Sequence, residues 1–425
     1  MVDFRPFRGL RFDPAVAGDP ADLVAPPYDV IDGELQSRLY RKSPYNVVRL
    51  ILGRESDRYE VAAVRFAEWR RKGVLVPEAE PVFYVYVQDF SCPISGRPLS
   101  RTGVVGALRL EPFESGWVRP HERTLPKAKE DRLRLLEACR ANLCPIFGLY
   151  PEDLEVLEPT RRALEAELPA VDVSDEEGCR HRLWPLREER RAREIERGLS
   201  AQWVLIADGH HRYETALAFR DRLRERGELS PDHPANFVLA YLCSMRDPGL
   251  VVLPTHRVLV DSGRSTREFA RELSSVFEVR TCEEPLPPER AEASPEGSEW
   301  FGAALRDGPF LLLRVPDSEA LGRLLPEFSP EVRRMAVVVL DRVVFSRMLG
   351  VEASEAASEG RLRYTRDFHE ALEQVRAGRA HAAFFVPPPG IDAIRRAAES
   401  GQKLPEKTTF FVPKLLSGLV FRPLE

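Results

Sequence analysis

Residues 203–212 read WVLIADGHHR, and residues 213–219 continue as YETALAF. The apolar run at the start predicts a buried strand, the polar segment 207–212 a tight turn, and the residues from Arg212 onward a helix. Gly209 can adopt backbone conformations that are closed to other residues. A helix that begins near Arg212 points its free N–H groups and its positive dipole end at the same place. The stretch therefore predicts a strand, a turn and a helix, with an anion site at the turn.

The turn carries candidate catalytic and phosphate-binding groups. Gly209, His211 and Arg212 are predicted to bind phosphate together with the start of the helix, and His210 is a candidate catalytic residue. Asp208 is predicted either to hold Mg²⁺ or to orient a histidine, because hard cations prefer carboxylate oxygen. The alternative interpretation is that Asp208 only caps the helix and that the histidines are satisfied polar residues of a turn.

A second polar cluster precedes a helix that we predict over about residues 130–141. Glu122 or His121 is the candidate general base, a role whose efficiency depends on a pKa near the working pH. The candidate phosphate-binding residues of this cluster are Thr124, Lys129 and Arg132. From spacing alone, a solvated charged face explains the cluster equally well. The assignment of Glu122 requires residues 121–132 and 208–212 to meet in space, which a sequence does not show.

Lysine is rare in this chain and unevenly distributed. Only seven of the 62 basic residues are lysine, and five of these seven lie in segments 127–129 and 403–414. A lysine ammonium is a compact charge that suits a phosphate oxygen. Lys129, Lys407 and Lys414 are therefore predicted to neutralise a second phosphate or the leaving group. The alternative for the tail is an edge strand protected by lysines.

Composition excludes several classes of protein. A chain of 425 residues with 43% hydrophobic residues can form two or three cores. No apolar stretch approaches the roughly 20 residues that span a bilayer, and the first residues lack the pattern of a signal peptide, so we expect a cytoplasmic protein. Six scattered cysteines without a Cys-x-x-Cys pair indicate neither a zinc ribbon nor a disulfide framework. The net charge of −5 gives no reason to expect nucleic-acid binding, so the expected partner is a small-molecule substrate.

Periodicity predicts an α/β or α+β fold with a mixed sheet. Helical spacing marks residues 57–71, and β-branched and aromatic residues mark neighbouring strands at 81–87 and 103–110. Residues 151–200 are interpreted as charged and helical with a break near Gly178, and 282–299 as a linker. Further strand-like apolar runs lie at 250–260, 310–314, 336–340 and 382–386.

We expect three regions along the chain. Residues 1–79 form an N-terminal segment that packs on a phosphate-binding core at 80–262. Residues 263–425 form a C-terminal α/β domain, whose tail at 404–418 returns to the site.

The whole chain resembles the DUF1015 family of bacterial and archaeal proteins. The matching segments lie in the family's order: Pro26–Val30, His121-Glu122-x-Thr124, Lys129-x-Asp131-Arg132, Ala207–Arg212, Leu253–Arg257 and Leu404–Lys414. This resemblance implies that the two polar clusters and the lysine-bearing tail belong to one site.

The segment Asp208–Arg212 also resembles the phosphate-binding signature of the ParB and sulfiredoxin superfamily, in which a Gly-x-x-Arg turn at a helix start holds nucleotide phosphates. The reactive cysteine of sulfiredoxin would fall at His210, and no basic helix-turn-helix follows the motif, so sulfiredoxin and DNA-partition activities are not expected. The superfamily includes kinases that phosphorylate free serine. The resemblance therefore implies a small-molecule phosphotransferase or phosphohydrolase, with serine or phosphoserine as a candidate substrate, Mg²⁺ as cofactor, and ATP, ADP or CTP as a candidate nucleotide.

Two other functions stay open at this point. The turn could hold a nucleotide in a regulatory module without rapid turnover. Alternatively, a metal-dependent hydrolase could gather its ligands from Asp208 and from His121, His210, His211 and His256. Against the second alternative, adjacent histidines rarely reach one metal, and the chain contains no His-Glu-x-x-His.

Overall fold

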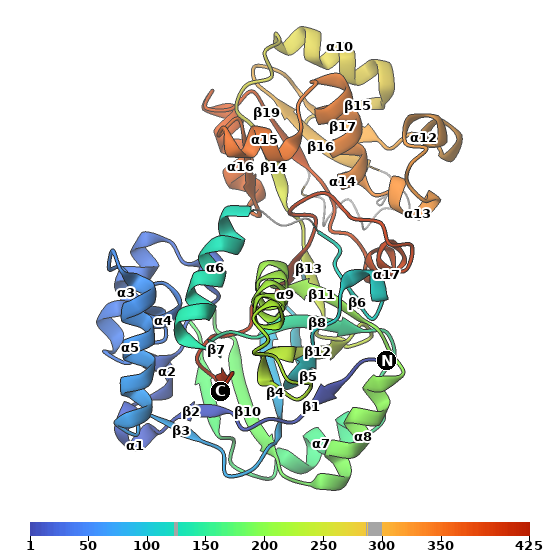
Figure 1. The fold of residues 1–425 in the computed structure, drawn as a ribbon. Coiled ribbons are helices and arrows are strands. Elements are labelled where there is room, and N and C mark those ends of the chain that lie inside the picture. The colour runs from blue at the N-terminus through green and yellow to red at the C-terminus, as the bar shows by residue number, and fades with distance from the viewer. Residues whose placement is uncertain (123–125, 286, 288–299) are drawn as a thin grey trace. The chain divides into compact units, whose positions relative to one another are not determined.

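The computed structural model describes residues 1–122, 126–285, 287 and 300–425. Within it the chain forms two compact units, the first comprising Met1–Pro120, Thr124–Val251 and Pro413–Glu425, and the second His121–Arg123 and Val252–Val412 (Figure 1). The first unit is therefore discontinuous in sequence, since it takes its last segment from beyond the second unit. The region boundaries that we expect near residues 79 and 262 stay predictions.

The first unit is built on a nine-stranded sheet. Its strands run in the order β6 (Val118–Arg119), β11 (Val204–Asp208), β8 (Ile146–Tyr150), β12 (Phe237–Ser244), β5 (Pro98–Arg109), β4 (Phe83–Ser91), β10 (Arg180–Leu186) and β9 (Val171–Ser174), with β1 (Phe4–Arg5) beside β5. The pairs β11 with β6 and β12 with β8 are parallel, whereas the other pairs are antiparallel. The predicted mixed α/β architecture with a mixed sheet is confirmed.

Apolar residues explain where the core of this unit lies. Every residue of β12 is buried, because its sequence FVLAYLCS is largely apolar on both faces. Helix α9 (His210–Glu225) directs Tyr213, Phe219 and Leu223 into the same cluster as the β11 residue Ile206. Helix α9 also packs on α6 (Pro126–Cys139), which in turn packs on α5 (Arg58–Arg71). The turn between β11 and α9 is thus fixed on both sides by core packing.

The remaining elements of the first unit are short or lie outside the main sheet. They are β2 (Leu10–Phe12), α1 (Pro14–Ala17), α2 (Pro20–Leu23), η1 (Tyr28–Val30), α3 (Gly33–Lys42), α4 (Val48–Ile51), β3 (Leu75–Pro77), η2 (Phe113–Ser115), β7 (Ala141–Asn142), α7 (Leu157–Leu164), α8 (Glu189–Ser200), η3 (Pro234–Asn236) and β21 (Arg422–Pro423). Strand β2 pairs with β3, and β7 pairs with β21.

Several local predictions can be compared with these elements. The helix at 57–71 and the adjacent strands at 81–87 and 103–110 are confirmed as α5, β4 and β5. The helix predicted from residue 130 begins instead at Pro126, because proline suits the first helical position. Lys129 therefore closes the first turn of α6 and Arg132 lies beyond it. The prediction that 151–200 is helical misses the β9–β10 hairpin, in which Gly178 has a φ of 80°.

The second unit contains a six-stranded sheet in which all strand pairs are antiparallel. The order is β15 (Glu278–Cys282), β17 (Phe310–Arg314), β16 (Trp300–Leu305), β19 (Ala382–Phe385), β14 (His256–Leu259) and β18 (Leu362–Thr365). The other elements are β13 (Val251–Leu253), α10 (Thr266–Val276), α12 (Ser318–Leu324), α13 (Pro330–Arg333), α14 (Ala336–Val339), the π-helix η5 (Leu340–Met348), α15 (Ala353–Ser358), α16 (Phe368–Arg376), α17 (Ile391–Glu399) and β20 (Phe410–Val412).

The predicted runs at 310–314 and 382–386 are strands, but the run at 336–340 is not. It forms α14 and the start of η5, and all of its residues are buried. A short apolar run that is buried on every side has no periodicity that distinguishes a strand from a helix. The predicted linker at 282–299 lies largely outside the described residues.

None of the helices in the described residues combines the length and the apolar composition that a membrane crossing requires.

Candidate functional site

The turn between β11 and α9 is formed by one glycine. Strand β11 ends at Asp208, Gly209 follows with a φ of 89°, and α9 begins at His210. A Cβ atom on Gly209 would lie 2.9 Å from Nε of Arg212. Glycine is required here for its left-handed backbone and for the close approach of the arginine. Gly209 is the N-cap residue of α9, and Asp208 lies one position before it. The interpretation of Asp208 as the cap of this helix is therefore wrong.

Asp208 faces two cations of the same unit. Its Oδ2 lies 3.4 Å from Nη2 of Arg212 and 3.6 Å from Nζ of Lys414. The three side chains are 21%, 13% and 17% exposed, respectively, so solvent screens the group only in part. Burial raises the pKa of Asp208, but the charges of Lys414 and Arg212 outweigh it and lower that pKa to about 2. The carboxylate is therefore ionised at neutral pH and is a poor proton acceptor.

Arg212 links this cluster to a small cavity. Its Nη1 donates to the carbonyl oxygen of Pro145, and its guanidinium lines a cavity of about 60 Å³ together with Tyr28, Arg132 and Cys144. The guanidinium of Arg132 stacks 4.0 Å from the centre of the Tyr28 ring. This volume is far below the ~300–1,000 Å³ of a typical ligand pocket. The cavity has room for a small group at most, so any larger ligand would contact the turn from outside it.

Tyr28 and Asp29 are two residues near this turn that were not predicted from the sequence. Burial raises the pKa of Tyr28, and the charge of Arg132 opposes that rise. The charge of Asp29, which is exposed, acts on both Tyr28 and Arg212. Residues 28–30 form a 3₁₀ turn. The sequence feature that could have identified Tyr28 and Asp29 is the Pro26-Pro27 pair before them, because it fixes the backbone that presents the two side chains.

The other predicted residues of the first unit have identifiable partners. Nζ of Lys129 donates to Oε2 of Glu214 at 2.9 Å, so its charge is already neutralised. Arg132 donates to Oδ2 of Asp131 at 2.7 Å. His210 is buried, and its charge contributes to the low pKa of Asp208. His211 is half-buried in the first turn of α9.

The predicted base lies in the second unit, beside the tail. Nε2 of His121 lies 2.7 Å from Oγ1 of Thr409 and 3.7 Å from Oε1 of Glu122. The same Glu122 oxygen accepts bonds from the backbone nitrogen and the hydroxyl of Thr409, each at 3.2 Å. The backbone oxygen of His121 accepts from the Leu404 nitrogen at 2.8 Å. Tail residues 404–409 therefore complete the surroundings of the 121–122 pair.

Lys407 is exposed in this segment and has a φ of 56°, which is unusual for a residue other than glycine. Its carbonyl oxygen accepts a bond from Nη2 of the buried Arg257 at 3.3 Å. Thr124 lies outside the described residues.

Comparison with known proteins gives one decisive match. The model of the family described as "Protein of unknown function (DUF1015)" matches residues 4–341, which is most of the chain. The chain belongs to the DUF1015 family. No curated protein matches the DUF1015 chain in sequence.

Three solved structures resemble the DUF1015 chain weakly. A conserved hypothetical protein from Pyrococcus furiosus shares 14% identity, covers 70% of this chain and 87% of its own, and gives a TM-score of 0.34. A free serine kinase in complex with AMP shares 15% identity, with coverages of 70% and 84% and a TM-score of 0.36. SbnI with a C-terminal truncation, from Staphylococcus aureus, shares 12% identity, with coverages of 75% and 87% and a TM-score of 0.38. Likenesses this weak do not establish an activity.

Within the described residues of the DUF1015 chain, the only group of three or more His, Cys, Asp or Glu residues with ligand atoms within 4.8 Å of one another is Asp175, Cys179 and His181. This group contains none of the residues proposed for a metal-dependent hydrolase. Burial lowers the pKa of His256 to about 4, and its ring packs 5.3 Å from the Phe385 ring. His256 is thus a neutral residue of an aromatic core.

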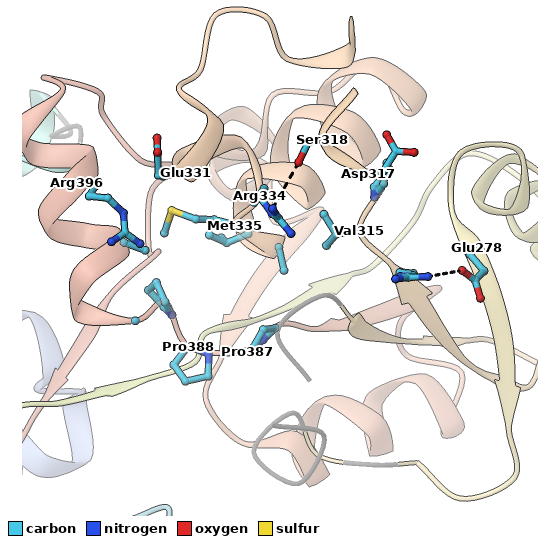
Figure 2. A pocket seen from close by; sticks show the side chains of 17 residues that line it. Glu278, Val315, Asp317, Ser318, Glu331, Arg334, Met335, Pro387, Pro388 and Arg396 are labelled. Atoms are coloured by element: carbon cyan, nitrogen blue, oxygen red, sulfur yellow. Dashed lines mark hydrogen bonds and ion pairs between the residues drawn. The ribbon is translucent and has the colours of Figure 1, made fainter. Parts of the chain in front are cut away.

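The DUF1015 chain also has a larger cavity in its second unit, of about 860 Å³ (Figure 2). Three arginines and three carboxylates line it: Arg314, Arg334, Arg396, Glu278, Asp317 and Glu331. Arg314 pairs with Glu278 at 3.2 Å, and Asp317 caps α12. Because its charges balance, this cavity offers no excess positive charge to an anion, and it contains none of the predicted site residues.

Proposed function

We propose that the Asp208–Arg212 turn binds the phosphate of a small-molecule ligand and that this protein is a phosphotransferase or phosphohydrolase. The observation that carries the proposal is the convergence of the cations of Arg212 and Lys414 on one carboxylate at the start of α9. An incoming phosphate would compete with Asp208 for both cations while it accepts bonds from the first N–H groups of the helix. The Gly209-x-x-Arg212 spacing, which resembles the signature of the ParB and sulfiredoxin superfamily, supports the same role.

The reaction requires an attacking hydroxyl group or water, a base and a leaving group. The attacking oxygen forms a bond to phosphorus, the bond from phosphorus to the leaving oxygen breaks, and the proton of the attacking group passes to the base. Asp208 is unsuited to be the base because of its low pKa. Glu122 stays the predicted base, and serine, phosphoserine or a nucleotide stays the predicted ligand class.

The predicted Mg²⁺ at Asp208 needs a separate test. Two cations already face this carboxylate, and a divalent cation beside them would be repelled. Titration of the protein with Mg²⁺ tests that prediction directly.

Phosphorus NMR tests the proposed function. Purified protein with Mg²⁺ is offered ATP, ADP or CTP, each with and without serine, and in a separate sample phosphoserine alone. We expect a new phosphoester or free phosphate signal from the wild type that is lost in Asp208→Asn. The matched control is Asp172→Asn, which removes a carboxylate of the same unit that is paired with Arg180 at the surface.

A nucleotide-binding regulatory module is the second candidate. The observation in its favour is the low pKa of Asp208, which leaves the turn with two cations for a phosphate but with a carboxylate that is a poor proton acceptor. Nucleotide binding without turnover in any NMR sample would favour this function over the first. Absence of both binding and turnover would contradict both.

A further inference from the structure

The segment that carries Lys414 is held by buried polar side chains of the first sheet. Nη2 of Arg101 donates to the carbonyl oxygen of Pro413, and Nε2 of Gln88 donates to that of Lys414 at 3.0 Å. Arg101 also donates to the side-chain oxygen of Gln88. Both side chains are fully buried on strands β5 and β4. The backbone on either side of Lys414 is thus bound by groups that have no access to water.

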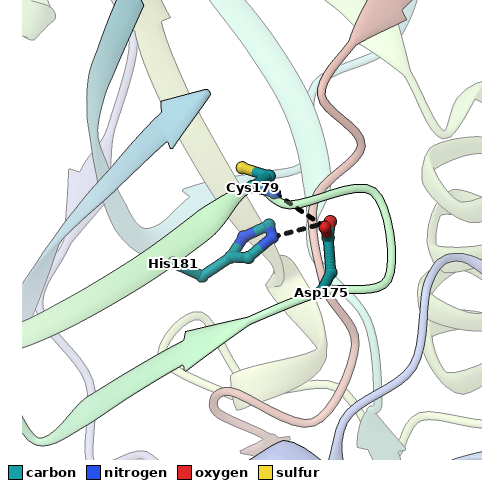
Figure 3. A group of neighbouring side chains, drawn as sticks. All are labelled: Asp175, Cys179 and His181. Carbon is teal, nitrogen blue, oxygen red and sulfur yellow. Dashed lines mark hydrogen bonds and ion pairs between the residues drawn. The ribbon is translucent and has the colours of Figure 1, made fainter. Parts of the chain in front are cut away.

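A hydrogen-bonded chain supports the same segment from β4 and β10. The Leu416 nitrogen donates to the hydroxyl of Tyr86 at 3.4 Å, and that hydroxyl lies 2.6 Å from Nδ1 of His181. On the far side of the ring, Nε2 lies 3.0 Å from Oδ2 of Asp175 (Figure 3). Burial raises the pKa of Asp175, but the hydrogen bond from His181 and those from the backbone nitrogens of Cys179 and Glu177 lower it overall, so the carboxylate accepts. Nε2 therefore carries the proton, and Nδ1 accepts from Tyr86.

Asp175 and His181, together with Cys179, are also the residues whose possible metal-ligand atoms lie within 4.8 Å of one another, but their geometry favours hydrogen bonding. Figure 3 shows the Asp175 carboxylate facing the imidazole and the backbone nitrogen of Cys179, whereas the sulfur lies on the other side of that residue. Both ring nitrogens of His181 already have partners. Burial raises the pKa of the Cys179 thiol to about 12, and the positive charge of Arg101 acts on the same thiol. A thiol that keeps its proton and a neighbouring cation both oppose a metal.

We propose that Tyr86, His181 and Asp175, together with Gln88 and Arg101, are positioning residues for Lys414. They fix the backbone of Pro413–Leu416 so that the Lys414 ammonium stays beside Asp208. None of the five needs to contact the ligand. The consequence for affinity rests on the proposed phosphate-binding function, whereas the consequence for the position of Lys414 does not.

Tyr86→Phe is the variant that tests the link. It keeps the ring and its packing but removes the hydroxyl that bridges Leu416 and His181. We expect the affinity for ADP to fall about 3- to 10-fold, the effect of losing a hydrogen bond of ordinary strength. In a Lys414→Ala background the same substitution should leave the affinity unchanged, because Tyr86 acts only through Lys414. Equal losses in both backgrounds would overturn the proposal in favour of general destabilisation.

Amine labelling tests the position of Lys414 without any ligand. The chain has only seven lysines, so the rate of acetylation at each can be followed by mass spectrometry. We expect Lys414 to react several-fold faster in Tyr86→Phe than in the wild type, with Lys72, which directly follows α5, unchanged. The matched control is Tyr150→Phe, which removes a buried hydroxyl without a hydrogen-bond partner among the described residues.

The two measurements separate the two proposals. Faster labelling of Lys414 without ADP binding by the wild type would support the positioning role and count against the proposed function. Unchanged labelling of Lys414 in Tyr86→Phe would overturn the positioning role whatever the protein binds.

Discussion

The carboxylates of Asp208 and Glu122 have opposite surroundings. Asp208, in the first unit, faces the charges of Arg212 and Lys414. Glu122, in the second unit, accepts bonds from the amide and hydroxyl of Thr409, with His121 beside it. Cationic partners hold a carboxylate in its ionised form, which makes Asp208 a poor proton acceptor. The difference teaches that Asp208 is suited to organising charge, and it leaves Glu122 as the predicted base.

The largest expected effect is on the rate of turnover, and it tests that division of roles. Glu122→Gln should lower the rate of phosphoryl turnover by about 10²- to 10⁴-fold, the usual contribution of a general base, with nucleotide affinity unchanged. Phosphorus NMR time courses and calorimetry measure the two quantities. Asp29→Asn serves as the comparison, because Asp29 is the exposed carboxylate whose charge acts on Arg212. A large loss of turnover in Asp29→Asn with none in Glu122→Gln would move the base to the 26–30 loop.

Substitutions of the two glycines that flank α9 test how much the close packing at the turn contributes to stability. Gly209→Ala should lower the free energy of unfolding by about 2–4 kcal/mol, because the new Cβ is strained and meets the guanidinium that Pro145 and Asp208 hold. Gly227, at the other end of the helix, has a φ of 71° but open space around it, and it provides the comparison variant Gly227→Ala. Its cost should be only about 1–2 kcal/mol. Urea denaturation measures both, and equal costs would show that the contact with Arg212 is unimportant.

The pH dependence of stability separates the two units. The folded pKa of His256, about 4, lies below its unfolded value of about 6.5. The unfolded state therefore binds a proton first, and stability falls as the pH drops from about 6.5 to about 4. Through this group the free energy of unfolding should fall by about 2 kcal/mol between pH 7.5 and pH 5, and His256→Phe should abolish that fall. Urea denaturation at the two pH values measures it.

Asp208 provides the control for that experiment. Its folded pKa is lowered to about 2, so its contribution is present above about pH 4 and is lost as the pH falls toward 2. Asp208→Asn should therefore leave the change between pH 7.5 and 5 as it is in the wild type. If His256→Phe also leaves it unaltered, His256 is not the group that titrates.

Two lysines of the first unit give the smallest and most specific test. Lys414→Ala should weaken ADP binding about tenfold, the effect of losing a charged hydrogen bond to phosphate. Lys129→Ala should change it by at most about twofold, because Lys129 is engaged with Glu214 near the surface. Calorimetric titrations compare them, and a larger effect at Lys129 would relocate the phosphate toward α6.

The sequence predicts the strand, turn and helix at 203–219 because each element has a local cause. An apolar run, a polar segment with a glycine and the residues that follow it are all readable within a few positions. The contact of Lys414 with Asp208 is not readable in this way, since it joins segments about 200 positions apart. The same holds for the stacking of Arg132 on Tyr28.

The two wrong secondary-structure predictions, at 151–200 and 336–340, also have local causes. The β9–β10 hairpin lies within a charged region, and its own turn at Asp175–Gly178 is acidic, so the charge of the region suggested a helix. The buried run at 336–340 lacks the polar positions that would reveal its period. Composition within a short window cannot replace the pairing partner that decides such cases.

The discontinuity of the first unit has a consequence for the order in which the protein is made. Residues 413–425 belong to that unit, but they are synthesised only after residues 252–412. At ordinary translation speeds this delay is roughly 10–30 s. During that time the Asp208 turn lacks Lys414, so an interruption of translation after residue 412 would leave the turn without one of its two cations. The proposed function would therefore begin only once residues 413–425 have joined the first unit.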